Sequence, residues 1–149
     1  MKLSLLLLLA SFAGAADTGD IKTVYLLPMA NGFDQFLAIR LTTGVVLQVV
    51  TDPQKADGLL TDRIGTAFEQ KLNEIYGPKV KDKDADTDDS SRPTMSPLSR
   101  AKGAIFLVDR KSRNVVWSTY ERPKNNSPDE MNHVADKVAG KLFKDLKGK

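Results

Sequence analysis

The sequence of 149 residues contains no cysteine, one histidine and one tryptophan. Without cysteine the chain can form neither a disulfide nor a zinc–thiolate site, and it can carry no lipid on an amino-terminal cysteine. A single histidine also cannot build a metal site from several imidazole ligands. A protein of this length without covalent cross-links must therefore be stabilised by its hydrophobic core.

Motifs that mark common catalytic centres are missing as well. The sequence has no Gly-x-Ser-x-Gly elbow, no His-Glu-x-x-His pair and no glycine-rich loop for a phosphate. His133 would have to reach a serine and an aspartate across the fold to act as a base, and its place beside Val134 favours a structural role. Carboxylate pairs of the glycoside hydrolase type stay open, because they need only converge in space. The sequence predicts a protein that is not an enzyme and needs no cofactor.

The chain has neither a strong net charge nor, after its first residues, a long apolar segment. It carries 22 basic and 19 acidic residues, a net charge of +3 that falls to +2 once Lys2 is removed with the leader. This balance gives no general attraction to nucleic acid. No later segment approaches the roughly 20 apolar residues that cross a bilayer. We expect no nucleic-acid partner and no transmembrane helix in the mature chain.

The first residues have the pattern of a secretory signal peptide. Lys2 precedes an apolar run from Leu3 to Ala10, and Ala13-Gly14-Ala15 supplies the small-x-small cleavage pattern. We expect cleavage near Ala15 or Ala16, which removes residues 1–16 and leaves 17–149 as a single domain. The predicted location is periplasmic or secreted, and the alternative is an amphipathic anchor that is retained.

The rest of the chain alternates between strand and helix patterns. Runs of β-branched and aromatic residues predict strands at 21–29, 45–50, 58–62, 103–108 and 114–120. Apolar residues at helical spacing predict helices at 33–41, 66–76 and 128–146. Residues 79–100 are rich in charge, serine and proline, which predicts a flexible charged loop. The order β-α-β-β-α-loop-β-β-α predicts an α/β fold, an α+β sandwich with one mixed sheet of about five strands and three helices packed on it.

Three carboxylates spaced five residues apart occur in the stretch TDPQKADGLLTD, residues 51–62. A metal site would require Asp52, Asp57 and Asp62 to converge. Their expected positions at a strand end, in a turn and at a helix start favour hydrogen bonds to nearby backbone amides instead. We interpret the stretch as part of the architecture rather than as a site.

A sharper metal candidate lies in the charged segment. The alternating residues are Asp82, Asp84, Asp86 and Asp88. Aspartate at every second position is how a calcium-binding loop begins, because alternate side chains can face one cation. That pattern also requires glycine at the sixth position and glutamate at the twelfth, where this chain has Thr87 and Pro93. A solvated linker is favoured, and binding of a divalent cation or small ligand outside the cytoplasm is the alternative function.

Two features of the carboxy-terminal third are candidate contact surfaces. Lys137, Lys141 and Lys144 recur at helical spacing and form a basic face, although cations near a helix C-terminus also complement its dipole. Strict alternation along the strand at 114–120 would put Val115 on the side of Trp117, a core candidate. Tyr120, at the strand end, is the better exposed aromatic residue. We predict Tyr120 and the three lysines as possible interaction residues.

Three segments taken together resemble a set of small bacterial envelope domains. They are VYLLPM, VVTDPQKADGLLTD and FLVDRKSRNVVWSTY. The pattern is similar to the amino-terminal domain of TolB and to the curli-secretion lipoprotein domain, whose lipidated cysteine this chain lacks. The matching residues are Asp52, Pro53, Ala56, Asp57, Val108, Asp109, Val116, Trp117 and Ser118. The resemblance implies an exported, non-enzymatic cell-envelope protein that acts through contact with another envelope protein.

Overall fold

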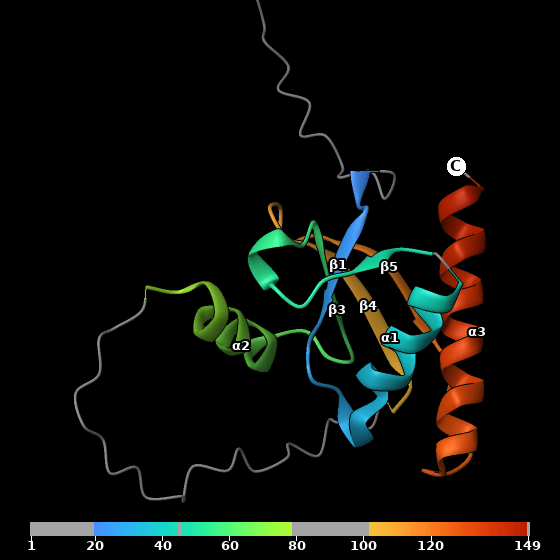
Figure 1. Ribbon diagram of the computed structural model, residues 1–149. Helices are drawn as coiled ribbons and strands as arrows, with labels where there is room; N and C mark the ends of the chain where they lie inside the picture. The colour runs from blue at the N-terminus through green and yellow to red at the C-terminus, as the bar shows by residue number, and fades with distance from the viewer. Residues whose placement is uncertain (1–19, 45, 79–101, 149) are drawn as a thin grey trace, which may run out of the picture.

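The computed structural model describes residues 20–44, 46–78 and 102–148, in which five strands and three α-helices form one α+β fold (Figure 1). The strands are β1 (Thr23–Leu26), β2 (Gln48–Val49), β3 (Gly58–Thr61), β4 (Ala104–Asp109) and β5 (Val115–Tyr120). The helices are α1 (Phe33–Thr43), α2 (Thr66–Tyr76) and α3 (Pro128–Lys147). The predicted fold class and element order are confirmed. The first two strands are shorter than predicted, because only part of each apolar run pairs in the sheet.

The five strands make a single mixed sheet in the order β2-β1-β3-β4-β5. β1 pairs in parallel with β2 on one side and with β3 on the other. β4 is antiparallel to both β3 and β5, so it alone runs in the opposite direction. The two edges of the sheet are therefore β2, with two residues, and β5, with six.

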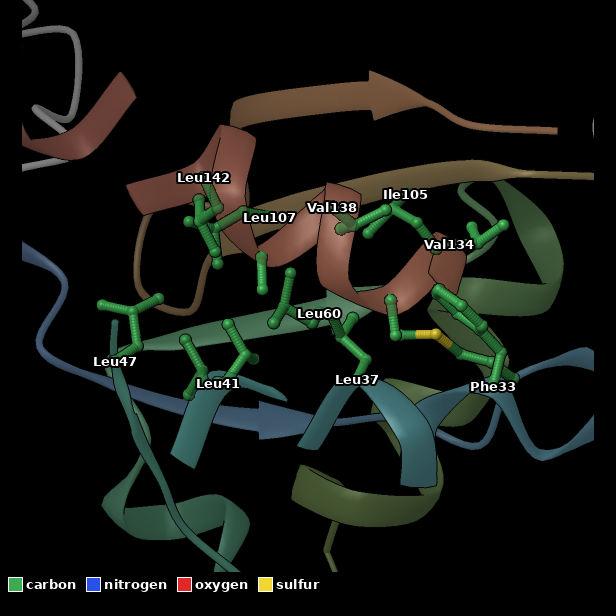
Figure 2. Close-up of a cluster of buried hydrophobic side chains, with 14 of the residues drawn as sticks. Phe33, Leu37, Leu41, Leu47, Leu60, Ile105, Leu107, Val134, Val138 and Leu142 are labelled. Atoms are coloured by element: carbon green, nitrogen blue, oxygen red, sulfur yellow. The ribbon is translucent and has the colours of Figure 1, made fainter. Parts of the chain in front are cut away.

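Helices α1 and α3 cover one face of the sheet and enclose the larger part of the core. Figure 2 shows Leu37 and Leu41 of α1 and Val138 of α3 directed toward side chains from the strands. The cluster contains sixteen buried residues, which come from both helices, from the loops beside them and from three strands. The apolar stripe predicted for the last helix is thus buried against α1 and the sheet, as its periodicity requires.

The opposite face of the sheet carries only α2. Its buried cluster is small and consists of five residues, Leu27, Leu59, Phe68, Leu72 and Val108. These come from α2, from the residue that follows β1 and from β3 and β4, and none comes from β5. The α2 side of β5 therefore lies outside the covered part of the sheet.

A β-bulge interrupts the pairing of β4 with β5. Leu107 pairs with Trp117, whereas Val108 pairs with Val115, so Val116 is the extra residue. Val116 and Trp117 consequently both pack against the larger cluster. Val115 pairs with a residue of the α2 side and is 45% exposed. The expectation that Val115 shares the side of Trp117 is wrong, because an inserted residue reverses the alternation beyond it.

Candidate functional site: the open edge of strand β5

The three carboxylates of the TDPQKADGLLTD stretch bond to separate parts of the backbone. Asp52 Oδ1 accepts the Gln54 amide at 2.9 Å and caps the short 3-10 turn at Pro53–Lys55. Asp57 Oδ2 accepts the amides of Lys22 and Thr23 and the Thr23 hydroxyl at 2.9–3.1 Å. Asp62 Oδ2 accepts the Ala30 amide at 2.8 Å. The interpretation as architecture holds, but only Asp52 accepts from a backbone amide close by in the chain, whereas Asp57 and Asp62 accept from amides more than thirty residues away.

The electrostatics of these turns do not suit acid–base catalysis. Burial alone would raise the pKa of Asp57, but its bonds from Thr23 and Lys22 and the charge of Lys111 outweigh burial and hold the pKa below 3.8. Burial likewise opposes the lowered pKa of Asp109, whose carboxylate accepts the amides of Ser112 and Lys111. Both groups are ionised at neutral pH and are already engaged by donors. In the described parts of the chain, no three acidic or histidine side chains are grouped for a metal ion.

The predicted basic face of α3 is exposed but partly engaged. Lys137 and Lys144 point into solvent, as does His133, whereas the Lys141 ammonium pairs with the Glu121 carboxylate. Acidic residues of the same helix make bonds of their own. Asp136 lies 3.8 Å from the Arg40 guanidinium, and Asp145 accepts the indole N–H of Trp117 at 2.8 Å. These contacts attach α3 to α1 and β5, and of the three lysines only Lys141 is paired.

Tyr120 lies at the end of β5 with 55% of its surface exposed, as its position in the sequence indicated. Ser118 on the same strand is also exposed, and the register pairs it with Phe106 of the α2 side. Val115, Ser118 and Tyr120 therefore present side chains on the uncovered part of the sheet. Sequence reasoning identified Tyr120 but not its neighbours, because the bulge and the limited reach of α2 are not visible in the sequence.

The backbone of β5 has an open edge. The Glu121 amide donates to the Gly103 carbonyl at 2.9 Å, so Glu121 and Gly103 occupy a hydrogen-bonded position of the β4–β5 ladder. Alternation in an antiparallel ladder then directs the amides and carbonyls of Ser118 and Tyr120 away from β4. Among the described residues, these outward groups have no hydrogen-bond partner. They are positioned to pair with another extended chain.

This edge has few of the features that normally prevent pairing. Edge strands are usually short, or they carry charged residues or proline, and each of these features disfavours pairing with a strand of another chain. β2 follows the rule with only two residues. The β5 sequence VVWSTY has six residues, no charge and no proline, and its bulge is the one protective feature. Arg113 and Arg122 are exposed just outside its two ends. We therefore take the β5 edge as the candidate site.

Comparisons of the chain with protein-family models, with curated proteins and with solved structures found no match. The resemblance to the TolB and curli-secretion domains stays a prediction. Within the described residues, no helix combines the length and apolar character that a membrane span requires. The predicted signal peptide at 1–16 and the metal candidates Asp82, Asp84, Asp86 and Asp88 lie outside the described residues.

Proposed function

We propose that this chain is an exported, non-enzymatic cell-envelope protein that binds another envelope protein through the edge of β5. The observation that carries the proposal is an uncharged edge strand whose outward backbone groups at Ser118 and Tyr120 have no partner among the described residues. An extended segment that pairs with such an edge gains main-chain hydrogen bonds, and side chains on alternate positions supply selectivity.

The surroundings of the edge define the chemistry of the partner segment. Val115 and Tyr120 offer exposed apolar and aromatic surface on the α2 side of the strand. Arg113 and Arg122 add positive charge at its two ends, whereas the Glu121 carboxylate is already paired with a lysine. The complementary partner is an extended segment with apolar residues at its centre and acidic residues at its ends. These charges would mainly speed the association of the two proteins and set the register of the added segment against β5.

Site-specific photo-crosslinking in intact cells tests the proposed surface. The change Tyr120→p-benzoylphenylalanine places the reactive group on the edge, and the same amino acid at Glu74, on the exposed side of α2, serves as the matched control. We expect a reproducible adduct with an envelope protein from position 120 and none from position 74. Mass spectrometry of the adduct would identify the partner.

A second variant distinguishes a partner that forms backbone hydrogen bonds with β5 from a protein that only lies near position 120. Ser118→Pro removes an outward amide that β4 does not use, so it blocks an added strand while the sheet stays intact. We expect this variant to suppress the adduct from position 120. A wild-type adduct yield in Ser118→Pro, or equal adducts from positions 120 and 74, would contradict binding through this edge.

The export part of the proposal rests on the amino-terminal sequence and has its own test. Intact mass measured on protein recovered from the periplasm and from the medium should correspond to a chain that begins at Ala16 or Asp17. The same measurement distinguishes retention from release. A full-length chain in the cytoplasmic fraction would contradict export, whatever the outcome of the crosslinking.

A further inference from the structure

Two arginines and a tyrosine meet at the end of the sheet where the β4–β5 hairpin turns. Tyr76 is the last residue of α2, and its hydroxyl donates to the Pro53 carbonyl at 2.8 Å, which fixes the ring. The guanidinium carbon of Arg110 lies 5.9 Å from the centroid of that ring, and that of Arg113 lies 5.7 Å from it. Both guanidinium groups therefore lie close to the same aromatic ring, although their like charges repel each other.

The backbone at Arg113 is held in a conformation that side-chain-bearing residues rarely adopt. Its φ of 63° lies in the left-handed region, where glycine is free of strain. The Arg113 amide donates to the Asp109 carbonyl at 2.9 Å, which closes the turn. A glycine would form the same turn more easily, so the turn itself does not explain an arginine here. Backbone strain of this kind is a reason to look for a role of the side chain.

Among the described residues, no carboxylate forms an ion pair with either of these two arginines. None of the four ion pairs among them includes Arg110 or Arg113, and Nε of Arg110 is buried without a hydrogen-bond partner. The charge of Asp52 also acts on Tyr76, but the Asp52 carboxylate accepts the Gln54 amide, and the carboxylates of Asp57 and Asp109 are likewise engaged by backbone amides. Burial raises the pKa of Tyr76 above 10.0 despite the two arginines, so its phenol stays neutral.

We propose that Arg110 and Arg113 bind a phosphate group at the hairpin end of the sheet, with the ring of Tyr76 as the floor of the site. A carboxylate is satisfied by one guanidinium fork, whereas a phosphate offers enough oxygens to accept from two. The phosphate is that of a lipid headgroup or of a free phosphorylated solute. Arg113 also lies beside one end of β5, but binding of a phosphate here does not require that a partner pairs with the β5 edge.

Titration of the purified, 15N-labelled protein with inorganic phosphate at constant ionic strength tests the site. We expect saturable chemical-shift changes at the Nε–H groups of Arg110 and Arg113 and at the amides of the turn between them. Arg113→Gly removes one guanidinium and relieves the strained backbone, so it should keep or raise Tm while phosphate affinity falls at least tenfold. Lys111→Gln removes a charge from the same turn and should change affinity less than threefold.

Vesicles distinguish the two sources of phosphate. Sedimentation of the protein with vesicles of phosphatidylglycerol that is lost in Arg113→Gly and kept in Lys111→Gln would assign the site to a lipid headgroup. A saturable phosphate shift without sedimentation would assign it to a free phosphorylated solute. The proposal is overturned if neither phosphate nor vesicles bind, if Arg113→Gly binds as well as the wild type, or if Lys111→Gln weakens binding equally.

Discussion

At the residue scale, the carboxylate of Asp57 ties the start of β3 to the start of β1. It accepts two backbone amides and the Thr23 hydroxyl from a segment 34 or more residues earlier in the chain. The Asp57 amide donates back to the Thr23 carbonyl at 3.0 Å. Bonds to an ionised acceptor are stronger than neutral ones, so this side chain holds two parallel strands in register.

Asp57→Asn should lower the free energy of unfolding by about 1–2 kcal/mol, because the three donors that converge on Oδ2 would meet a neutral carbonyl oxygen in place of a charged carboxylate oxygen. Urea unfolding monitored by circular dichroism measures this loss. Asp52→Asn is the matched control in the same loop. Asparagine caps a helical turn as well as aspartate does, so that variant should change stability by only a few tenths of a kcal/mol. If both variants lost the same unfolding free energy, removal of a negative charge from the loop would be the cause, and not the bonds from Asp57 to the start of β1.

The same residue should make stability depend on pH in the acid range. The pKa of Asp57 in the folded protein lies below its ordinary value of 3.8. Its stabilisation is therefore complete above the unfolded-state pKa and is lost as pH falls through the lower folded-state value. The difference in unfolding free energy between the wild type and Asp57→Asn should be largest at pH 6 and should narrow below pH 3.8. A difference that is constant with pH would contradict this assignment.

At the element scale, β5 has one side bonded to β4 and one side open. The Thr119 amide points toward β4, and the Ser118 amide points outward, by the alternation that the Glu121–Gly103 bond establishes. Proline at these adjacent positions should therefore have unequal effects. Thr119→Pro removes a ladder bond and leaves a carbonyl of β4 unpaired, whereas Ser118→Pro removes no bond within the sheet.

We expect Thr119→Pro to lower the free energy of unfolding by about 1–3 kcal/mol more than Ser118→Pro does, because it leaves a carbonyl of β4 without its donor. Urea unfolding of both variants at pH 7 measures the difference. If the two variants were equally destabilised, the outward direction of the Ser118 amide would be wrong, and the open edge with it.

At the scale of the whole molecule, the sheet has two unequal faces. The face under α1 and α3 has sixteen buried apolar residues, and the face under α2 has five. Helix α3 is also capped at its start by the Ser127 hydroxyl, which accepts the Glu130 amide, and the Trp117–Asp145 bond attaches it to β5. Local stability follows such differences in buried apolar contact.

Amides of α2 should therefore exchange with solvent at a lower opening free energy than those of α1 and α3. Native-state hydrogen exchange measured by NMR tests this order. Leu72→Ala should speed exchange mainly in α2, whereas Leu37→Ala, in the larger cluster, should speed exchange throughout the sheet. Uniform protection in the three helices would show that the two faces open together.

The sequence alone determined the order of helices and strands and several of their ends. Gly44 follows the last residue of α1, and the side chain of Ser127 caps the start of α3. These features depend on periodicity and on hydrogen bonds between residues at most a few positions apart, so neighbouring residues are enough to predict them. The exposed position of Tyr120 was predictable for the same reason, since it follows from the end of the strand.

Only the tertiary structure decided which strand lies at the open edge and what the carboxylates bind. Asp62 reaches the Ala30 amide 32 residues away, and the bulge at Val116 exists only in relation to β4. The approach of Arg110 and Arg113 to Tyr76 likewise joins a helix end to a hairpin more than thirty residues later. Each of these contacts depends on the order and register of strands, which long-range packing sets and no local pattern encodes.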